Sequence, residues 1–88
     1  MTYRLLYNEE VVKSHIPELP KVIRTIIKRA VEERLTVDPI GFGKPLRYSL
    51  KGYRRLRVGN YRVVYRIDNA EHVVIIVAVQ HRKDVYDE

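Results

Sequence analysis

Alternating apolar and polar positions are clearest between Tyr53 and Arg66 (YRRLRVGNYRVVYR), and they predict a β-hairpin. Side chains in a strand point to opposite faces with a period of two. The pair Gly59-Asn60 accepts the positive φ that a tight hairpin turn needs, and a two-residue turn sets Arg57 directly opposite Arg62. One face then carries Tyr53, Arg55, Arg57, Arg62, Val64 and Arg66, and the expected core face carries Arg54, Leu56, Val58, Tyr61, Val63, Tyr65 and Ile67.

Helical spacing of apolar residues predicts two helices in the N-terminal half. The first begins after Asn8, a favourable N-cap, and ends before Pro17. The second begins near residues 18–20 and continues to Leu35. Its apolar stripe, which we expect to pack in the core, consists of Val22, Ile23, Ile26, Ile27, Ala30, Val31 and Leu35.

The remaining strands complete a small α+β domain over residues 1–88. Residues 2–7 predict a short N-terminal strand, and residues 46–50 are expected to open the main sheet. Residues 72–80 (HVVIIVAVQ) are apolar on both faces, which is typical of a central strand. We therefore expect two N-terminal helices packed on a twisted antiparallel sheet of three to four strands, plus the N-terminal strand.

The register of the last strand follows from the turn after Asp68. Pairing Asp68 with Glu71 brings Val77 beside Arg62 and makes His81 project from the same face as Arg62. A slip of one residue would move His81 to the opposite face.

Positive charge is concentrated on the hairpin and its approach. The net charge is +6, and no acidic residue lies between Asp38 and Asp68. This interval contains Lys44, Arg47, Lys51, Arg54, Arg55, Arg57, Arg62 and Arg66. Like charges that face each other destabilise a sheet, so the cluster favours a bound anion such as phosphate over an ordinary solvated surface.

Several classes of protein are disfavoured by what the sequence lacks. There is no cysteine, no signal-peptide pattern and no apolar run of spanning length, so we expect a cytoplasmic protein without a membrane partner. No metal-ligand or cofactor motif is present, so we expect neither a bound metal ion nor a cofactor. We expect His15 and His72 to be structural or exposed.

The residues with chemistry to offer are expected near one end of the sheet. They are Arg55, Arg57, Arg62, His81, Arg82 and Tyr86. Arginines suit the negative charge of a phosphorane-like transition state. An RNA substrate supplies its own nucleophile in the 2′-hydroxyl, so the protein needs an acid, a base and an aromatic side chain to orient the bases. Since Arg62 lies on the face away from the core, we expect Arg62→Ala to disturb folding little.

The motif YRRLRVGNYRVVYRI, followed by HRKDVY, resembles the RelE/ParE superfamily of toxin–antitoxin toxins over nearly the whole chain. The resemblance implies a compact domain with two helices on a twisted antiparallel sheet. In the RelE branch it implies metal-independent cleavage of messenger RNA in the ribosomal A site, with a 2′,3′-cyclic phosphate product and inhibition of translation. It also implies a RelB-like antitoxin that wraps and neutralises the toxin.

The same resemblance assigns roles to single residues. Arg62 falls on the phosphate-stabilising arginine, Arg82 on the proposed general acid, and Tyr86 on the tyrosine that stacks on or orients the substrate. Relatives often carry lysines where this chain has Arg55 and Arg57, and arginine does not readily lose a proton. His81 is therefore the expected substitute base, and further RNA contacts are expected from Lys44, Arg47, Lys51, Arg54, Arg66 and Lys83.

Two other functions remain open at this point. A ParE-like toxin would inhibit DNA gyrase through protein contacts, without nuclease chemistry. A non-catalytic domain would use the same arginines to bind RNA or acidic antitoxin residues.

Overall fold

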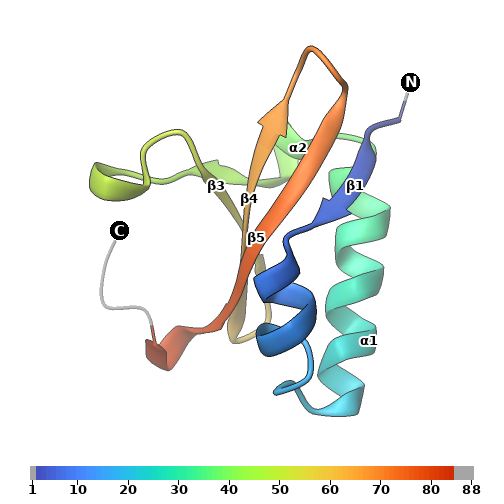
Figure 1. The fold of residues 1–88 in the computed structure, drawn as a ribbon, viewed down its shortest axis with the longest axis vertical. Coiled ribbons are helices and arrows are strands. Elements are labelled where there is room, and N and C mark those ends of the chain that lie inside the picture. The colour runs from blue at the N-terminus through green and yellow to red at the C-terminus, as the bar shows by residue number, and fades with distance from the viewer. Residues whose placement is uncertain (1, 85–88) are drawn as a thin grey trace.

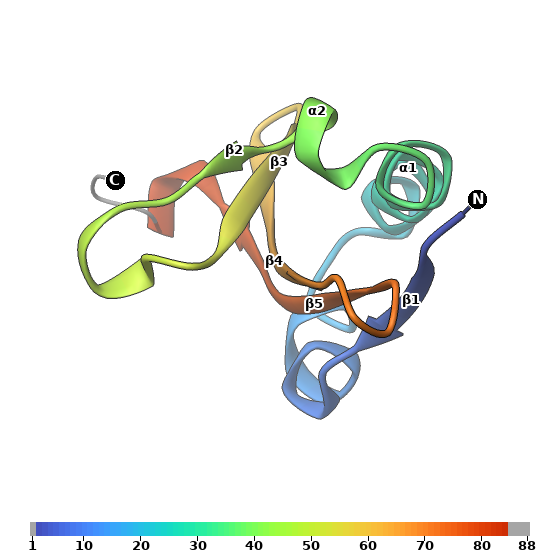
Figure 2. The same ribbon diagram turned by 90° about the horizontal axis from the view of Figure 1, so that it is seen from above.

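A five-stranded sheet curves around one long helix, α1 (Figures 1 and 2). The computed structural model describes residues 2–84 of the chain. The strand order is β1-β5-β4-β3-β2, and β1 runs parallel to β5 while the other neighbouring pairs are antiparallel. The strands are β1 (Arg4–Tyr7), β2 (Lys44–Pro45), β3 (Arg54–Val58), β4 (Tyr61–Asp68) and β5 (Val73–His81). The predicted α+β class, the N-terminal strand and the central position of β5 are confirmed.

Both predicted helices are present. The first begins after Asn8, whose side chain accepts a hydrogen bond from the Glu9 N–H at 3.0 Å, and has π-helical geometry over Val11–His15. The second, α1 (Lys21–Ala30), continues through a π-helical segment, Val31–Leu35. No helix within residues 2–84 combines the length and the apolar character needed to cross a bilayer.

The connection between α1 and the hairpin differs from the sequence expectation. The strand predicted over residues 46–50 is wrong, since the sheet instead receives Lys44–Pro45 (β2) and Tyr48–Leu50 form a 3₁₀ turn. The reason is local, because Tyr48 adopts a positive φ of 58° that ends the extended backbone. A short helix, α2 (Pro39–Phe42), also forms in this connection, and the Asp38 side chain caps it by accepting the Gly41 N–H at 2.9 Å.

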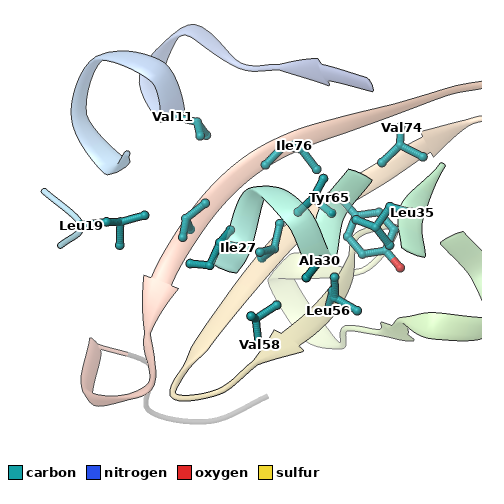
Figure 3. Packing of buried hydrophobic residues seen from close by; sticks show 13 residues of the cluster. Val11, Leu19, Ile27, Ala30, Leu35, Leu56, Val58, Tyr65, Val74 and Ile76 are labelled. Carbon is teal, nitrogen blue, oxygen red and sulfur yellow. The ribbon is translucent and has the colours of Figure 1, made fainter. Parts of the chain in front are cut away.

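The core lies between α1 and the sheet (Figure 3). Its most completely buried large side chains include Tyr65, Leu35, Ile76, Val11 and Val31. The expected core face of the hairpin is confirmed, since Leu56, Val58, Val63 and Tyr65 all belong to this cluster. The expected helical stripe is too wide, because Val22 and Ile26 are 68% and 49% exposed.

Two side chains reach out of the core region and hold the α2–β2 segment against the sheet. The Tyr65 hydroxyl donates to the Pro39 carbonyl, and Arg54 Nη2 donates to the carbonyls of Ile40 (2.8 Å) and Gly43 (3.0 Å). A Cβ at Gly43 would come within 1.8 Å of the Tyr65 hydroxyl, so only glycine fits there. These hydrogen bonds form a clamp that fixes β2 in the sheet, and with it the position of Lys44, the first residue of β2.

Candidate phosphate-binding surface

The hairpin has the predicted register, and it gathers basic side chains on the face that points away from the core. Arg57 pairs with Arg62, and Arg55 pairs with Val64. Lys44 on β2 pairs with Arg55 and therefore shares its face. We call this surface the basic face, defined by Lys44, Arg55, Arg57, Arg62 and Arg66. Within it, Arg57 and Arg62 occupy adjacent strands about 5 Å apart.

The predicted register between β4 and β5 is wrong by three residues at Arg62. Asp68 pairs with Val73 rather than Glu71, because the turn is longer and places His72 at a positive φ of 58°. A bulge then leaves one extra residue of β5 between the partners of Val64 and Tyr65. Arg62 consequently lies opposite Gln80, not Val77.

Arg62 is the one charged residue among the buried side chains of the described chain, with 8% of its surface exposed. The expectation that it is freely exposed on the sheet is therefore wrong. Its Nε–H donates to Gln80 Oε1 at 2.8 Å, a short and well-made hydrogen bond. Gln80 was not predicted as a site residue because the expected register placed Val77 beside Arg62. The available signal was a polar residue at the end of the apolar run HVVIIVAVQ.

His81 lies on the face opposite to the one expected. It pairs with Tyr61 in the ladder, and the two rings meet edge to face at a centroid distance of 4.9 Å. His81 Nδ1 accepts the Lys83 N–H at 3.1 Å. A neutral ring with this contact carries its proton on Nε2, so Nε2 presents a donor rather than an acceptor.

Arg82 lies beside the hairpin turn. Its backbone N–H donates to the Asn60 carbonyl at 2.8 Å, and its side chain is exposed. Arg57, Arg62 and Arg82 thus come from three chain segments to one end of the sheet. Tyr86 lies outside the described residues.

The other basic residues expected to bind RNA are distributed more widely. Arg47 and Lys51 are exposed on either side of the 3₁₀ turn, and Lys83 is exposed in the turn after β5. Arg54 points to the core side, where its guanidinium clamps the two carbonyls described above. Its contacts are those of a structural residue, whereas Lys44 and Arg66 are exposed on the basic face.

The two other histidines make structural contacts, as expected. His15 Nδ1 accepts the Val79 N–H at 3.1 Å, where β5 extends beyond the end of β1. The His72 ring stacks on Tyr3 at 3.7 Å with an interplanar angle of 14°. Within residues 2–84 no three side chains of histidine, cysteine, aspartate or glutamate are placed to hold a metal ion.

A separate hollow of about 290 Å³ opens between the first helix and α1. Its lining is mostly apolar, with Val12, Ile16 and Leu19 along one side, and it reaches the core residues Val63 and Ile76. Because Val63 points away from the basic face, this hollow and the arginines occupy different sides of the sheet. The lining of the hollow also includes Arg24 and Lys28, but the facing arginine pair lies on the basic face.

A long helix on a curved sheet, with an arginine-rich hairpin on the outer face, is the architecture of a toxin family. Residues 12–86 match the family described as the ParE toxin of the type II toxin–antitoxin system parDE. The chain belongs to this RelE/ParE superfamily and is a RelE-like toxin of a type II toxin–antitoxin system.

Individual relatives support the RelE side of the superfamily. The chain is 39% identical to toxin RelG of Mycobacterium tuberculosis over 76% of each sequence. It is 32% identical to toxin RelE3 of Methanocaldococcus jannaschii over 96% of each. The toxin–antitoxin complex RelBE2 of M. tuberculosis contains a similar fold, with a TM-score of 0.86, 32% identity, and coverage of 93% of this chain and 100% of that one.

Proposed function

We propose that this toxin is a ribosome-dependent endoribonuclease that cleaves messenger RNA in the A site and so inhibits translation. The observation that carries the proposal is Arg62, a buried arginine held by Gln80 on a face with four other basic side chains. A guanidinium fixed in this way is pre-organised to meet a phosphate, and an anion relieves the repulsion between the facing arginines.

The reaction requires no nucleophile from the protein. The 2′-oxygen of the RNA attacks the adjacent phosphorus, a 2′-O–P bond forms, and the P–O5′ bond breaks to leave a 2′,3′-cyclic phosphate. The proton of the 2′-hydroxyl goes to a base, and the 5′-oxygen receives one from an acid. Arg62 and Arg57 stabilise the extra negative charge that develops on the phosphorane-like transition state.

Arg55 extends the positive surface along β3. Arg82 lies exposed beside the hairpin turn, and we assign it the role of donating a proton to the leaving oxygen. Because His81 lies on the face opposite to Arg62, packed against Tyr61, it has no assigned contact with the phosphate in this proposal. In this proposal the 2′-hydroxyl proton leaves to solvent or to a ribosomal group. Tyr86 orients the substrate base, as the resemblance implies.

Two partners follow from the proposal. The first is a cognate RelB-like antitoxin, supported by the solved RelBE2 complex and by the RelB–RelE antitoxin–toxin complex of Methanococcus jannaschii, to which the chain is 30% identical with a TM-score of 0.69. The second is the ribosome with its messenger RNA. Neither a cofactor nor a metal ion has a role in the proposed chemistry.

The test is primer extension on ribosomes programmed with a defined messenger. Wild type should cut in the A site, and Arg62→Ala should cut about 10²-fold more slowly or worse. Because Arg62 is buried, circular dichroism must show that the variant is folded. Arg29→Ala is a matched control, since Arg29 is an exposed arginine on α1, away from the basic face, and its removal should leave the rate unchanged.

Full cleavage by folded Arg62→Ala would contradict the assignment of the site. One alternative function, inhibition of DNA gyrase, is supported by the matching family description, which is that of the ParE toxin. No cleavage by wild type, together with gyrase-dependent DNA damage in cells, would establish a ParE-like gyrase inhibitor instead.

A further inference from the structure

Gln80 contacts the guanidinium of Arg62 directly from the neighbouring strand. The two residues are direct ladder partners on β5 and β4, and Gln80 Oε1 accepts the Arg62 Nε–H at 2.8 Å. Both side chains are removed from bulk water, with Arg62 buried and Gln80 half-buried. A hydrogen bond in such surroundings restrains its partners more strongly than one in solvent.

The geometry of guanidinium explains what this contact does. Its five N–H donors lie in one plane in a fixed fork, so an acceptor on Nε fixes the rotation of the whole plane. A guanidinium binds a phosphate in a two-pronged manner through two adjacent N–H groups, either Nε with one Nη or Nη1 with Nη2. With Nε held by Gln80 from the β5 side, the edge formed by Nη1 and Nη2 is turned away from Gln80.

The chemical type of the acceptor is as informative as its position. A carboxylate at residue 80 would make a stronger bond to Arg62, but it would also cancel the charge that attracts an anion. An amide accepts the Nε–H and remains neutral. Gln80 thus orients the arginine without competing with a phosphate for it.

We propose that Gln80 is a positioning residue of the phosphate site, acting through Arg62 and not by contact with the reacting atoms. The proposal rests on the proposed function and names a residue that the motif resemblance does not include. It makes a specific claim: the neutrality of residue 80 matters for anion binding, while its acceptor oxygen matters for orientation.

Two substitutions separate these properties. Gln80→Leu keeps a similar volume and removes the acceptor, whereas Gln80→Glu keeps the acceptor and adds a negative charge. Asn69→Asp is the matched control, because it makes the same amide-to-carboxylate change at an exposed position in the turn after β4. A purely structural role for Gln80 would leave anion binding in folded Gln80→Glu unchanged.

The first experiment is a titration of each full-length protein with inorganic phosphate, followed by NMR at the Arg62 Nε–H resonance. In wild type we expect a slowly exchanging proton and a saturable shift. Gln80→Leu should exchange faster and bind phosphate about 10-fold more weakly, and Gln80→Glu should show a protected proton with no phosphate response. Equal phosphate affinity in wild type and both Gln80 variants, or no response of Arg62 in wild type, would overturn the proposal.

The ribosome assay is run in parallel on the same proteins. Gln80→Leu should lower kcat about 10-fold with a smaller change in KM, and Asn69→Asp should match wild type. An inactive wild type whose Arg62 still responds to phosphate in a Gln80-dependent way would refute the nuclease function and leave the positioning role intact. An active wild type with normal rates in both folded Gln80 variants would refute the positioning role alone.

Discussion

The two faces of the β3–β4 hairpin are built from the same fourteen-residue stretch and have opposite properties. One face places Leu56, Val58, Val63 and Tyr65 against α1, where they are almost fully buried. The other carries Arg55, Arg57, Arg62 and Arg66, of which Arg57 and Arg62 face each other. The core face stabilises the hairpin by burying apolar area, and the basic face opposes it through charge repulsion. A stable core face therefore supports a strongly basic outer face whose charge attracts anions.

The largest effect should come from removing the central side chain of the core face. Tyr65→Ala should lower the free energy of unfolding by about 4 kcal/mol, because it leaves a cavity and releases the Pro39 carbonyl. Urea denaturation measures the change. A loss below about 1 kcal/mol would mean that Tyr65 does not anchor the core as the structure shows.

The next largest change in the free energy of unfolding should come from disturbing the clamp between this face and the α2–β2 segment. Gly43→Ala should cost about 2 kcal/mol, since the added methyl group collides with the Tyr65 hydroxyl and approaches the Arg55 carbonyl at 2.8 Å. Combining it with Tyr65→Phe should cost less than the sum of the single changes, because the nearest clashing atom is then absent. Strict additivity in urea denaturation would argue against the contact.

Alkaline pH should also weaken the core face. Burial raises the pKa of Tyr65 above its ordinary value of 10.0, against opposing contributions from Arg54, and burial likewise raises the pKa of Tyr7. With a folded-state pKa above the unfolded one, stability is fully present below pH 10 and is lost as pH rises through the folded value. The urea midpoint should fall above pH 10 less steeply in Tyr65→Phe than in wild type, and identical pH profiles would contradict this.

The smallest change in stability should come from the basic face. Arg66 is exposed, so Arg66→Gln should alter the free energy of unfolding by less than about 0.5 kcal/mol. If Arg66 contacts an RNA phosphate, the slope of log affinity against log salt should decrease by about 0.7. Fluorescence anisotropy with a short single-stranded RNA at several salt concentrations provides the test, and an unchanged slope would remove Arg66 from the binding surface.

The sequence was sufficient to predict the first hairpin but not the second pairing. Gly59-Asn60 specifies a two-residue turn, and the pairs from Val58–Tyr61 to Arg54–Tyr65 follow from it. The β4–β5 register depends on a turn that holds a non-glycine residue, His72, in a left-handed conformation, and on a bulge inside an apolar run. Neither has a signature in residue type, since every residue of that run suits a strand.

This difference decided how much of the site could be predicted. Arg55, Arg57 and Arg62 were placed correctly because they belong to the first hairpin. The partner of Arg62 and the face of His81 were placed wrongly because they depend on the second register. The burial of Arg62 also needed the tertiary structure, since alternation along β4 predicts a face and not the depth of a side chain.

The order of the strands in the sheet has a consequence for synthesis of the toxin. β5 lies between β1 and β4, so the first and fourth strands to be made have no common neighbour until residues 73–81 have left the ribosome. A nascent chain that ends before β5 lacks Gln80, lacks the strand that joins the N-terminal segment to the hairpin, and cannot close its core. Folding of the toxin domain therefore waits for residues 73–81, which join the N-terminal strand to the hairpin.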